Sequence, residues 1–347
     1  MRRVISLLLL TALLLSGCAG VGEPEKKQYN ATFLTLFDTV TTIVGRAESE
    51  ADFTAEAQKI HDELYVYHQL FDIYNDYEGV SNLKTVNDNA GISPVVVDRA
   101  IIDLLLDCKE YYDLTDGLVN VAMGSVLRLW HVARNDGLND IANAYLPDME
   151  ELKAAAEHMD LSCVVIDEEA SAVYITDPDA RLDVGAVAKG WSAQRVADNA
   201  PEGLLISVGG NVCATGPKDE NGTPWRVGVQ NPDGGDNYLH TLNITGGSVV
   251  TSGDYQRCYM VDGKFYHHII DPATLYPSEY WRSVTVVCAD SGLADALSTA
   301  LFLLPLEEGM ALAESCGADA LWVNEAGEQF HTPGFEALIR TSIEVKE

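Results

Sequence analysis

The chain from Cys163 onward is dominated by short apolar and β-branched runs with turn signals between them. Runs of this length and composition predict strands. The Asp262-Gly263 step between two such runs predicts a tight hairpin, because both residues tolerate the left-handed backbone of such a turn. The predicted strands are 163–167, 172–176, 204–208, 225–230, 239–244, 248–251 and 283–288, with a short strand pair near 320–331.

The first half instead shows apolar residues in a helical rhythm, after one β-branched run that predicts a strand over 33–45. No long linker interrupts residues 30–340, and 347 residues with 47% hydrophobic composition are enough for a large buried core. We therefore expect one α+β unit in which helix pairs interrupt the strand blocks. The predicted helices are 50–71, 98–113, 121–133, 148–158, 186–199 and 292–315.

The N-terminus has the pattern of an export signal. Two arginines follow Met1, an apolar run covers 4–15, and small residues precede Cys18. The run is short for a bilayer span, and small residues before a cysteine match a bacterial lipoprotein signal. We expect residues 1–17 to be a signal peptide, Cys18 to carry acyl chains, and 18–30 to tether the domain to the extracytoplasmic side of the cell membrane, in the periplasm or at the cell surface. The alternative is an ordinary secretory signal with an incidental cysteine.

The formal net charge of −31 argues against nucleic acid as a partner, because binding to its phosphates needs a basic surface. An anionic membrane would repel the protein body as well, so the expected membrane contact is the lipid anchor. A phosphorylated ligand must be held locally, by a metal ion, backbone N–H groups or single cations. The six cysteines after Cys18 are widely spaced and mostly lie in apolar runs, which favours buried free thiols over disulfides.

Asp295 and Thr299 are four residues apart in a run of small and apolar residues that predicts a helix over 293–304. This spacing places a carboxylate and a hydroxyl on one face, one turn apart. Hard cations such as Mg²⁺ bind a few protein oxygens and keep positions for water and phosphate, so the pair is a candidate metal site. The alternative is a helix cap or dipole partner at the aspartate, with a packed threonine that bonds to its own backbone.

Residues 181–190 predict a junction at which a strand ends near Asp183, Gly185 allows a turn, and a helix begins about Ala186. Backbone N–H groups, an acid and Lys189 are exposed together at such a junction, which suits an anionic or heterocyclic ligand. A plain strand-to-helix connection with a surface lysine explains the pattern about equally well.

Two glycine-containing runs and a histidine pair give weaker signals. The run 207–211 has paired glycines that allow close approach of a ligand or strand, but it lacks the dinucleotide-binding spacing, and the run 252–255 is similar in kind. His267 and His268 lie at a strand end, where successive side chains point to opposite faces. We expect one to be packed and the other to be free as a base or ligand, with Asp271 placed to orient it.

Taken together, these segments resemble the ApbE-like FAD:protein FMN transferases, a family of often lipid-anchored bacterial flavin-handling proteins. The resemblance runs from about Phe33 to Leu338. It implies one domain over 31–342 with a T-fold-like arrangement, in which duplicated strand and helix-pair units intertwine and the sheets are mixed antiparallel. The motifs that carry it are Asp183-x-x-Ala186-x-x-Lys189-Gly190, Ser207-Val208-Gly209-Gly210-Asn211, Ser252-Gly253-Asp254-Tyr255, His268-Ile269-Ile270-Asp271-Pro272 and 293–300.

The resemblance also implies roles for individual residues. One Mg²⁺ is expected to be held by the backbone carbonyl of Ala186 and the side chains of Asp295 and Thr299. The positions implied to contact FAD are Asp183, Lys189 and Ile270, with looser matches at Phe37, Tyr74, Leu118, Val119 and Asn120.

Three positions depart from the family pattern. Phe37 stands where many relatives have methionine, which keeps an apolar surface of different shape. Leu275 stands where the Asp-Pro-x-Thr-Gly turn of the family has glycine, so the local turn is expected to differ. Ser298 stands where some relatives have an acid, which leaves a fourth metal ligand open.

The activity implied by the resemblance is Mg²⁺-dependent transfer of FMN from FAD to a Ser or Thr hydroxyl of an exported acceptor protein, with release of AMP. His268 is the candidate general base, and Asp271 is a candidate to share that role. Two alternatives stay open. One is hydrolysis of FAD to FMN and AMP at the same metal site, and the other is a lipoprotein that stores or delivers FAD without turnover.

Overall fold

The structure is a computed structural model that describes residues 26–235 and 237–340. The predicted signal peptide 1–17 and the lipidation site Cys18 lie outside the described residues. The same holds for the predicted C-terminal domain boundary at residue 342.

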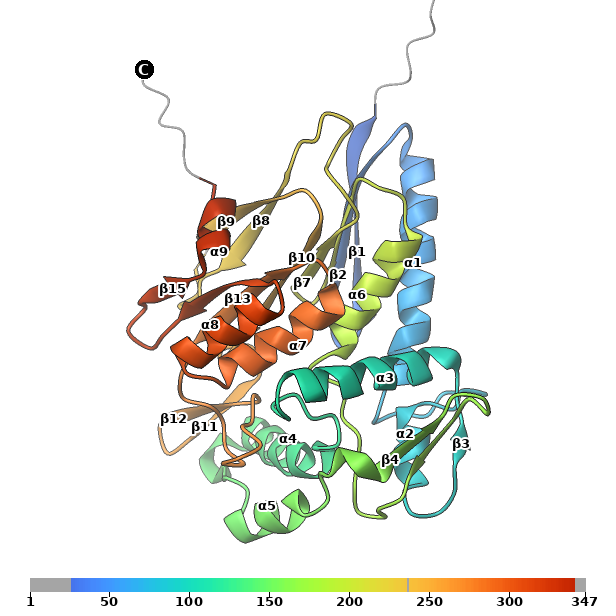
Figure 1. Cartoon of the computed structure of the whole chain (residues 1–347), viewed down its shortest axis with the longest axis vertical. Helices are drawn as coiled ribbons and strands as arrows, with labels where there is room; N and C mark the ends of the chain where they lie inside the picture. Colours follow the sequence, from blue (N-terminus) through green and yellow to red (C-terminus); the bar gives the residue numbers. More distant parts are fainter. Residues whose placement is uncertain (1–25, 236, 341–347) are drawn as a thin grey trace, which may run out of the picture.

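The centre of the molecule is an eight-stranded sheet with strand order β1-β2-β6-β7-β10-β13-β14-β15 (Figure 1). Every neighbouring pair in it is antiparallel. Its strands are β1 (Lys27–Leu36), β2 (Thr39–Ala47), β6 (Leu204–Val208), β7 (Asn211–Ala214), β10 (Gly247–Gly253), β13 (Ser283–Cys288), β14 (Asp319–Val323) and β15 (Gln329–His331).

Three smaller antiparallel sheets complete the β-structure. The Asp262-Gly263 step forms the predicted tight turn, with φ of +50° and +83° at the two residues. The strands of the small sheets are β3 (Val95–Val96), β4 (Val164–Asp167) and β5 (Ala172–Ile175), then β8 (Trp225–Gln230) with β9 (Tyr238–Ile244), and β11 (Cys258–Val261) with β12 (Lys264–His267).

Several helices begin where a side chain caps the first turn. The Ser49 side chain accepts the N–H of Asp52, and the Asp290 side chain accepts the N–H of Leu293. The helices are α1 (Glu50–Phe71), α2 (Leu83–Asp88), α3 (Arg99–Leu114), α4 (Gly124–Asn139), α5 (Met149–Ala156), α6 (Ala188–Asn199), α7 (Ser291–Phe302), α8 (Leu306–Ser315) and α9 (Pro333–Leu338), with 3₁₀ turns at Ile141–Asn143 and Leu161–Cys163.

Both faces of the large sheet are covered. Helices α1, α6, α7 and α8 lie along one face (Figure 1), and the β8–β9 hairpin and α9 pack on the other. Successive side chains of strand β10 point to opposite faces of the sheet. Val250 therefore packs with α7, and Val249 packs with β8 and β9 on the other face. The predicted α+β class with antiparallel sheets is confirmed, while the duplication of units stays a prediction.

The segment 33–45 was expected to be one strand, and this was wrong. It is a hairpin in which β1 and β2 are joined by Phe37 and Asp38, with φ of +52° and +54°. Strand β1 also begins at Lys27, so the last residues of the predicted tether are part of the sheet.

Other boundaries also differ from the prediction. The helical segment 292–315 is divided between α7 and α8 ahead of Pro305, which lacks the N–H that an uninterrupted helix needs there. Residues 181–183 form no regular strand, since Arg181 makes only an isolated bridge to Met123, and α6 begins at Ala188 rather than Ala186.

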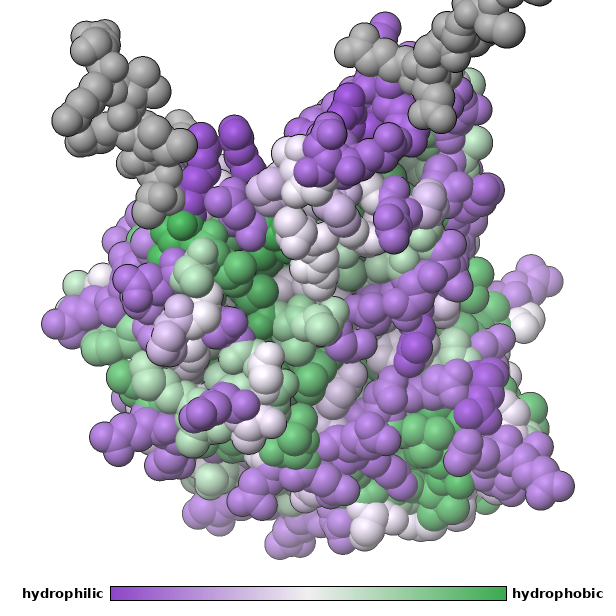
Figure 2. Space-filling model, turned by 45° about the horizontal axis from the view of Figure 1, so that its top comes forward, coloured by the Kyte–Doolittle hydropathy of each residue, from purple (hydrophilic) through white to green (hydrophobic). Residues whose placement is uncertain are grey.

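The six cysteines from Cys108 to Cys316 are free, as predicted. Figure 2 shows hydrophilic residues over much of one face, with separate apolar patches between them. None of the helices within residues 26–235 and 237–340 combines the length and the hydropathy needed to cross a bilayer.

Candidate active site

One cavity brings together segments that are far apart in the sequence. It is bordered by the β1–β2 turn, the segments after α1 and α3, helix α4, the loop before α6, the ends of β10 and β12, and helix α7. All of the predicted binding, metal and catalytic residues except Asp271 line it. The predicted residues in its lining are Phe37, Tyr74, Leu118, Val119, Asn120, Asp183, Ala186, Lys189, His268, Ile270, Asp295 and Thr299.

The carboxylate of Asp295 joins α7 to the start of α6 at one side of this cavity. Asp295 is only 4% exposed, and its Oδ2 accepts the backbone N–H of Gly190 at 2.8 Å. The ammonium Nζ of Lys189 lies 3.6 Å from the same oxygen. The buried negative charge is therefore partly balanced by a hydrogen bond and a cation.

Thr299 lies one turn after Asp295, and its hydroxyl is 3.5 Å from the Asp295 backbone carbonyl. Together with the backbone carbonyl of Ala186 these groups form what we call the oxygen corner: Ala186, Asp295 and Thr299. A carboxylate, a hydroxyl and a carbonyl are the ligand types that Mg²⁺ prefers, and they line the same cavity. The donor set therefore fits this cation.

Ser298 is the residue whose role as a fourth metal ligand was left open. Its hydroxyl donates to the Asp295 backbone carbonyl at 2.9 Å and lies 2.8 Å from the hydroxyl of Ser252. Ser298 is fully buried and is not part of the cavity lining. These contacts give Ser298 a packing role and add no support for it as a metal ligand.

The histidine pair divides as predicted. His267 Nε2 donates to the Ser278 carbonyl at 2.8 Å, and its Nδ1 accepts the N–H of Ile269 at 3.2 Å. Both ring nitrogens are thus used, and the ring packs edge-on against Phe302. His268 lines the cavity, and its shielded Nδ1 has no hydrogen-bond partner among the described residues.

The surroundings of His268 favour the neutral imidazole. Burial lowers the pKa of His268 to about 3, and the positive charges of Arg257, Lys189 and Arg134 act in the same direction, as does His267. A neutral ring with a free nitrogen is the form that accepts a proton. An anion bound in the cavity offsets these positive charges and raises this pKa.

Asp271 is the predicted site residue that lies outside the cavity lining. Its Oδ1 accepts the N–H of Ala273 at 2.8 Å, and its carbonyl accepts the N–H of Leu275 at 2.8 Å. Within the described structure the carboxylate closes a turn and makes no hydrogen bond to His268. The geometry therefore gives no support to an orienting or catalytic role for Asp271.

Leu275 occupies the turn position at which the family pattern has glycine. Its φ is +62°, so the backbone is left-handed here although the residue has a side chain. The side chain is buried and packs with Trp130 and Ile270, and the Leu275 carbonyl accepts the indole N–H of Trp130 at 2.9 Å. The expected difference from the turn of the relatives stays a prediction.

Asp183 stands in the loop that leads into α6. Its backbone N–H donates to the Val121 carbonyl at 2.8 Å, which ties this loop to the segment containing Leu118, Val119 and Asn120. Its Oδ1 accepts the N–H of Gly185 at 2.9 Å. Burial raises the pKa of Asp183, and this effect is opposed by that hydrogen bond and by nearby positive groups.

The turn at Phe37 presents an aromatic ring to the cavity. The Phe37 backbone N–H donates to His68 Nδ1 at 3.2 Å, and the two rings meet edge to face with centroids 5.6 Å apart. Across the turn, Gly209 donates its N–H to the Val40 carbonyl, and a Cβ on Gly209 would lie 2.7 Å from Thr39. Gly209 of the 207–211 run thus allows close approach of a neighbouring hairpin, whereas a Cβ on Gly210 would meet nothing within 4 Å.

Sequence reasoning missed several cavity residues on α4 and β7. His131 and Arg134 lie on α4, which extends beyond the predicted end at 133, and Arg257 lies between β10 and β11. Asn211 is 2% exposed, and its amide nitrogen has no hydrogen-bond partner among the described residues. The sequence indicated only indirectly that such cations exist. Because the chain is strongly acidic, a phosphorylated ligand must be held by local positive groups.

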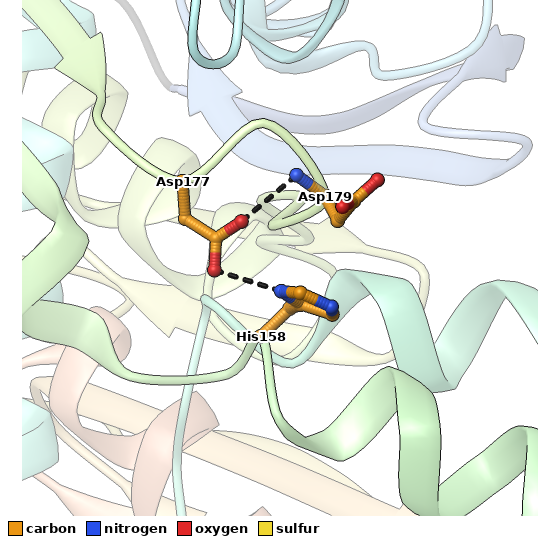
Figure 3. Close-up of side chains that lie close together, drawn as sticks. All are labelled: His158, Asp177 and Asp179. Carbon is orange, nitrogen blue, oxygen red and sulfur yellow. Dashed lines mark hydrogen bonds and ion pairs between the residues drawn. The ribbon is translucent and has the colours of Figure 1, made fainter.

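A second group of potential metal ligands lies outside this cavity (Figure 3). His158 Nδ1 pairs with Asp177 Oδ2 at 2.8 Å, and Asp177 Oδ1 accepts the backbone N–H of Asp179 at 2.9 Å. The pair raises the pKa of His158 and lowers that of Asp177. These mutual contacts account for the cluster without an ion.

The fold and the cavity define a class of α+β proteins in which one open antiparallel sheet and its covering helices border a deep, mixed polar and aromatic pocket. The chain belongs to the ApbE family, whose model matches residues 37–322. The resemblance inferred from the motifs is thereby confirmed.

Individual relatives agree with this assignment. The FAD:protein FMN transferase of Klebsiella pneumoniae (strain 342) is 33% identical over 279 residues, which cover 76% of this chain and 84% of that protein. The FAD:protein FMN transferase of Treponema pallidum (strain Nichols) is 34% identical over 262 residues, 70% of each chain. Among solved structures, the ApbE protein of Thermotoga maritima superposes with a TM-score of 0.79 at 29% identity, over 91% of this chain and 100% of that one.

Proposed function

We propose that this chain is an Mg²⁺-dependent FAD:protein FMN transferase that moves FMN from FAD to a Ser or Thr hydroxyl of an exported acceptor protein and releases AMP. The observation that carries the proposal is the meeting of the oxygen corner and the imidazole of His268 in one cavity of an ApbE-family chain. The relatives named above supply the reaction type.

In this reaction the acceptor oxygen forms a bond to the FMN-side phosphorus of FAD. The bond from that phosphorus to the bridging oxygen breaks, and its electron pair leaves with AMP. The proton of the acceptor hydroxyl goes to a base, and the imidazole of His268, which lines the cavity, is our candidate. A general base of this kind accelerates a reaction about 10²–10⁴-fold.

The oxygen corner is the proposed holder of Mg²⁺, which when bound neutralises charge on phosphate oxygens. Asp295 supplies the negative charge for the cation, and Thr299 and the Ala186 carbonyl supply neutral oxygens. Lys189, 3.6 Å from Asp295 Oδ2, contributes a second positive charge at the same place.

The aromatic and polar lining is the proposed site for the rest of FAD. Phe37 supplies an apolar ring surface, and Tyr74 supplies a second one that is 54% exposed. Asp183, Lys189 and Ile270 are the proposed flavin contacts. The segment of Leu118, Val119 and Asn120 borders the same space, with the Asn120 amide bonded to Met159 and Ala122.

The proposed location is the extracytoplasmic side of the cell membrane, through acyl chains on Cys18 after removal of residues 1–17. The basic start, the short apolar run and the small residues before Cys18 support this proposal. Mass spectrometry of the membrane-bound mature protein should find a lipid-modified N-terminal cysteine. A mature chain without lipid, cleaved elsewhere, would contradict it.

Product analysis tests the activity against its two alternatives. Purified protein is incubated with FAD and Mg²⁺, with and without exported redox proteins co-purified from the same host, and nucleotides and proteins are analysed separately. We expect AMP release only with an acceptor, together with covalent flavin on that acceptor. FAD consumption without an acceptor would favour a hydrolase, and tight FAD binding without AMP release under either condition would favour a storage protein.

A further inference from the structure

Two arginines line the cavity without a carboxylate partner. Arg134 lies on α4, and Arg257 lies between β10 and β11. Neither forms an ion pair within 4 Å in the described part of the chain, although the whole chain has a formal charge of −31. Arg134 is half-buried and Arg257 is exposed, so the pair forms a local positive patch that can bind an anionic ligand.

The guanidinium of Arg134 is held in place but not satisfied. Its Nη2 lies 3.3 Å from His131 Nδ1 and 3.4 Å from Asn135 Oδ1, while its Nε is shielded from solvent and has no partner among the described residues. Burial lowers the pKa of Arg134, and the charge of Arg257 adds to this effect. A buried N–H donor without an acceptor is unfavourable until a ligand supplies one.

The neighbouring rings show what kind of ligand fits. A guanidinium can only donate, so His131 Nδ1 accepts, and the lowered pKa of His131 agrees with a neutral ring. The ring of Tyr74 stacks on His131, with centroids 5.1 Å apart and planes 24° apart, and Tyr74 is 54% exposed. An open aromatic surface beside an unsatisfied guanidinium suits a heterocyclic base with a phosphate attached.

In the described structure the nearby carboxylates do not serve as hydrogen-bond acceptors for the two arginines. Arg257 and His131 exert a favourable charge interaction on the carboxylate of Asp183. The Oδ1 atom of Asp183 already accepts the N–H of Gly185. The oxygen corner has its own cation in Lys189, 3.6 Å from Asp295. The arginines are therefore available for a second anionic group of the same ligand.

We propose that Arg134 and Arg257 form an anion subsite for the AMP-side phosphate of FAD, with the adenine base against the ring of Tyr74. This inference rests on the proposed function. In the transfer reaction the bridging P–O bond breaks and its electron pair stays on AMP, so the two guanidinium groups stabilise the charge of the leaving group. Charge-assisted hydrogen bonds of this type are the strong ones.

Binding of AMP in the presence of a metal chelator isolates this subsite from the oxygen corner. Calorimetric titrations with AMP, adenosine and FMN are made on the full mature chain and on R134Q and R257Q. We expect each substitution to weaken AMP binding about tenfold or more, since a lost hydrogen bond to a charged group has this effect. Adenosine and FMN binding should change much less, and higher salt should weaken AMP binding to the wild type more than to either variant, since each variant keeps one guanidinium.

A matched control is R128Q, because Arg128 is an exposed arginine on the same helix and is not part of the cavity lining. R134K, which keeps the charge but loses the planar donor set, should fall between wild type and R134Q. Unchanged melting temperatures establish that the variants are folded. Equal AMP affinity for wild type and both glutamine variants overturns the inference, and so does an equal loss of FMN binding, which would assign the subsite to the FMN phosphate. Flavin transfer is measured separately, so its absence in the wild type would contradict the proposed function instead.

Discussion

The backbone N–H of Gly190 donates to Oδ2 of Asp295 over 2.8 Å, and this contact joins the first turn of α6 to the middle of α7. The two helices approach so closely that a Cβ on Gly190 would lie 2.2 Å from the Ser291 carbonyl oxygen and 2.5 Å from the Asp295 Cβ. The glycine thus fixes where the oxygen corner lies relative to Lys189.

Substitution of Gly190 by alanine should separate α6 from α7. We expect Gly190→Ala to lower the free energy of unfolding by about 1–3 kcal/mol, as overpacking does in other cores, and to weaken Mg²⁺ binding by moving Asp295. Chemical denaturation and metal titration measure the two effects. Gly246→Ala is the control, because a Cβ there meets no atom within 4 Å. Equal stability and Mg²⁺ affinity for both variants would count against this account.

His268 should remain neutral in the free protein well below neutral pH, because burial and nearby cations bring its pKa to about 3. NMR titration of the imidazole, assigned with His268→Gln, checks this directly. Binding of an anionic nucleotide should raise the pKa. A free-protein pKa near the ordinary value of about 6.5 would contradict the described environment.

The lowered pKa of His268 also predicts how the free energy of unfolding depends on pH. The unfolded chain binds a proton at this histidine below about pH 6.5, whereas the folded chain does so only near pH 3. Stability should therefore fall as the pH drops from about 6.5 toward 3, and the fall should be shallower in His268→Gln. Parallel pH dependence of the two proteins would show that His268 does not contribute.

Much of the fold could be predicted because its signals are local. The periodicity around Asp295 and Thr299 placed both on one face of a helix, and α7 has this face toward the cavity. The β1–β2 turn was missed because a phenylalanine such as Phe37 is not typical of a turn with positive φ. Only the surrounding contacts, such as the bond from Phe37 to His68, hold that conformation.

Part of the candidate site could be predicted because some of its residues lie in short local motifs. The short motifs pointed to Asp295, Thr299 and the histidine pair by their chemistry. The family resemblance supplied the Ala186 carbonyl and, with the strand pattern, the choice of His268. The role of Arg134 depends on which elements meet in space, and nothing in its own segment indicates it. Asn211 ends the 207–211 motif, but its unpartnered amide is visible only in the structure. For Asp271 the sequence suggested a functional role that the structure does not support. Its carboxylate is near His268 in sequence, but it accepts the N–H of Ala273 in a turn.

Leu275 offers a test of two opposing effects. Its left-handed backbone is strained by about 1–2 kcal/mol, which glycine would relieve. Its side chain is 7% exposed, and loss of a buried leucine costs about 2–5 kcal/mol. We expect Leu275→Gly to be net destabilising by about 1–3 kcal/mol in chemical denaturation. A more stable variant would show that strain outweighs burial at this turn.

Asn211 should matter for ligand binding more than for folding. Its buried amide nitrogen lacks a partner in the described structure, so Asn211→Leu should leave the free energy of unfolding unchanged or raise it by about 1 kcal/mol. FAD affinity should fall about tenfold if that nitrogen donates to the bound ligand. Unchanged FAD affinity, measured by flavin fluorescence, would contradict a binding role.

The mass of an acceptor protein after reaction with FAD and Mg²⁺ tests the central claim most directly. The wild type should add one FMN moiety per acceptor and release an equal amount of AMP, whereas Asp295→Ala should add none. Asp198→Ala, at an exposed aspartate on α6, should behave as the wild type. Full modification of the acceptor by Asp295→Ala, or AMP release by the wild type without any FMN on the acceptor, would contradict the account.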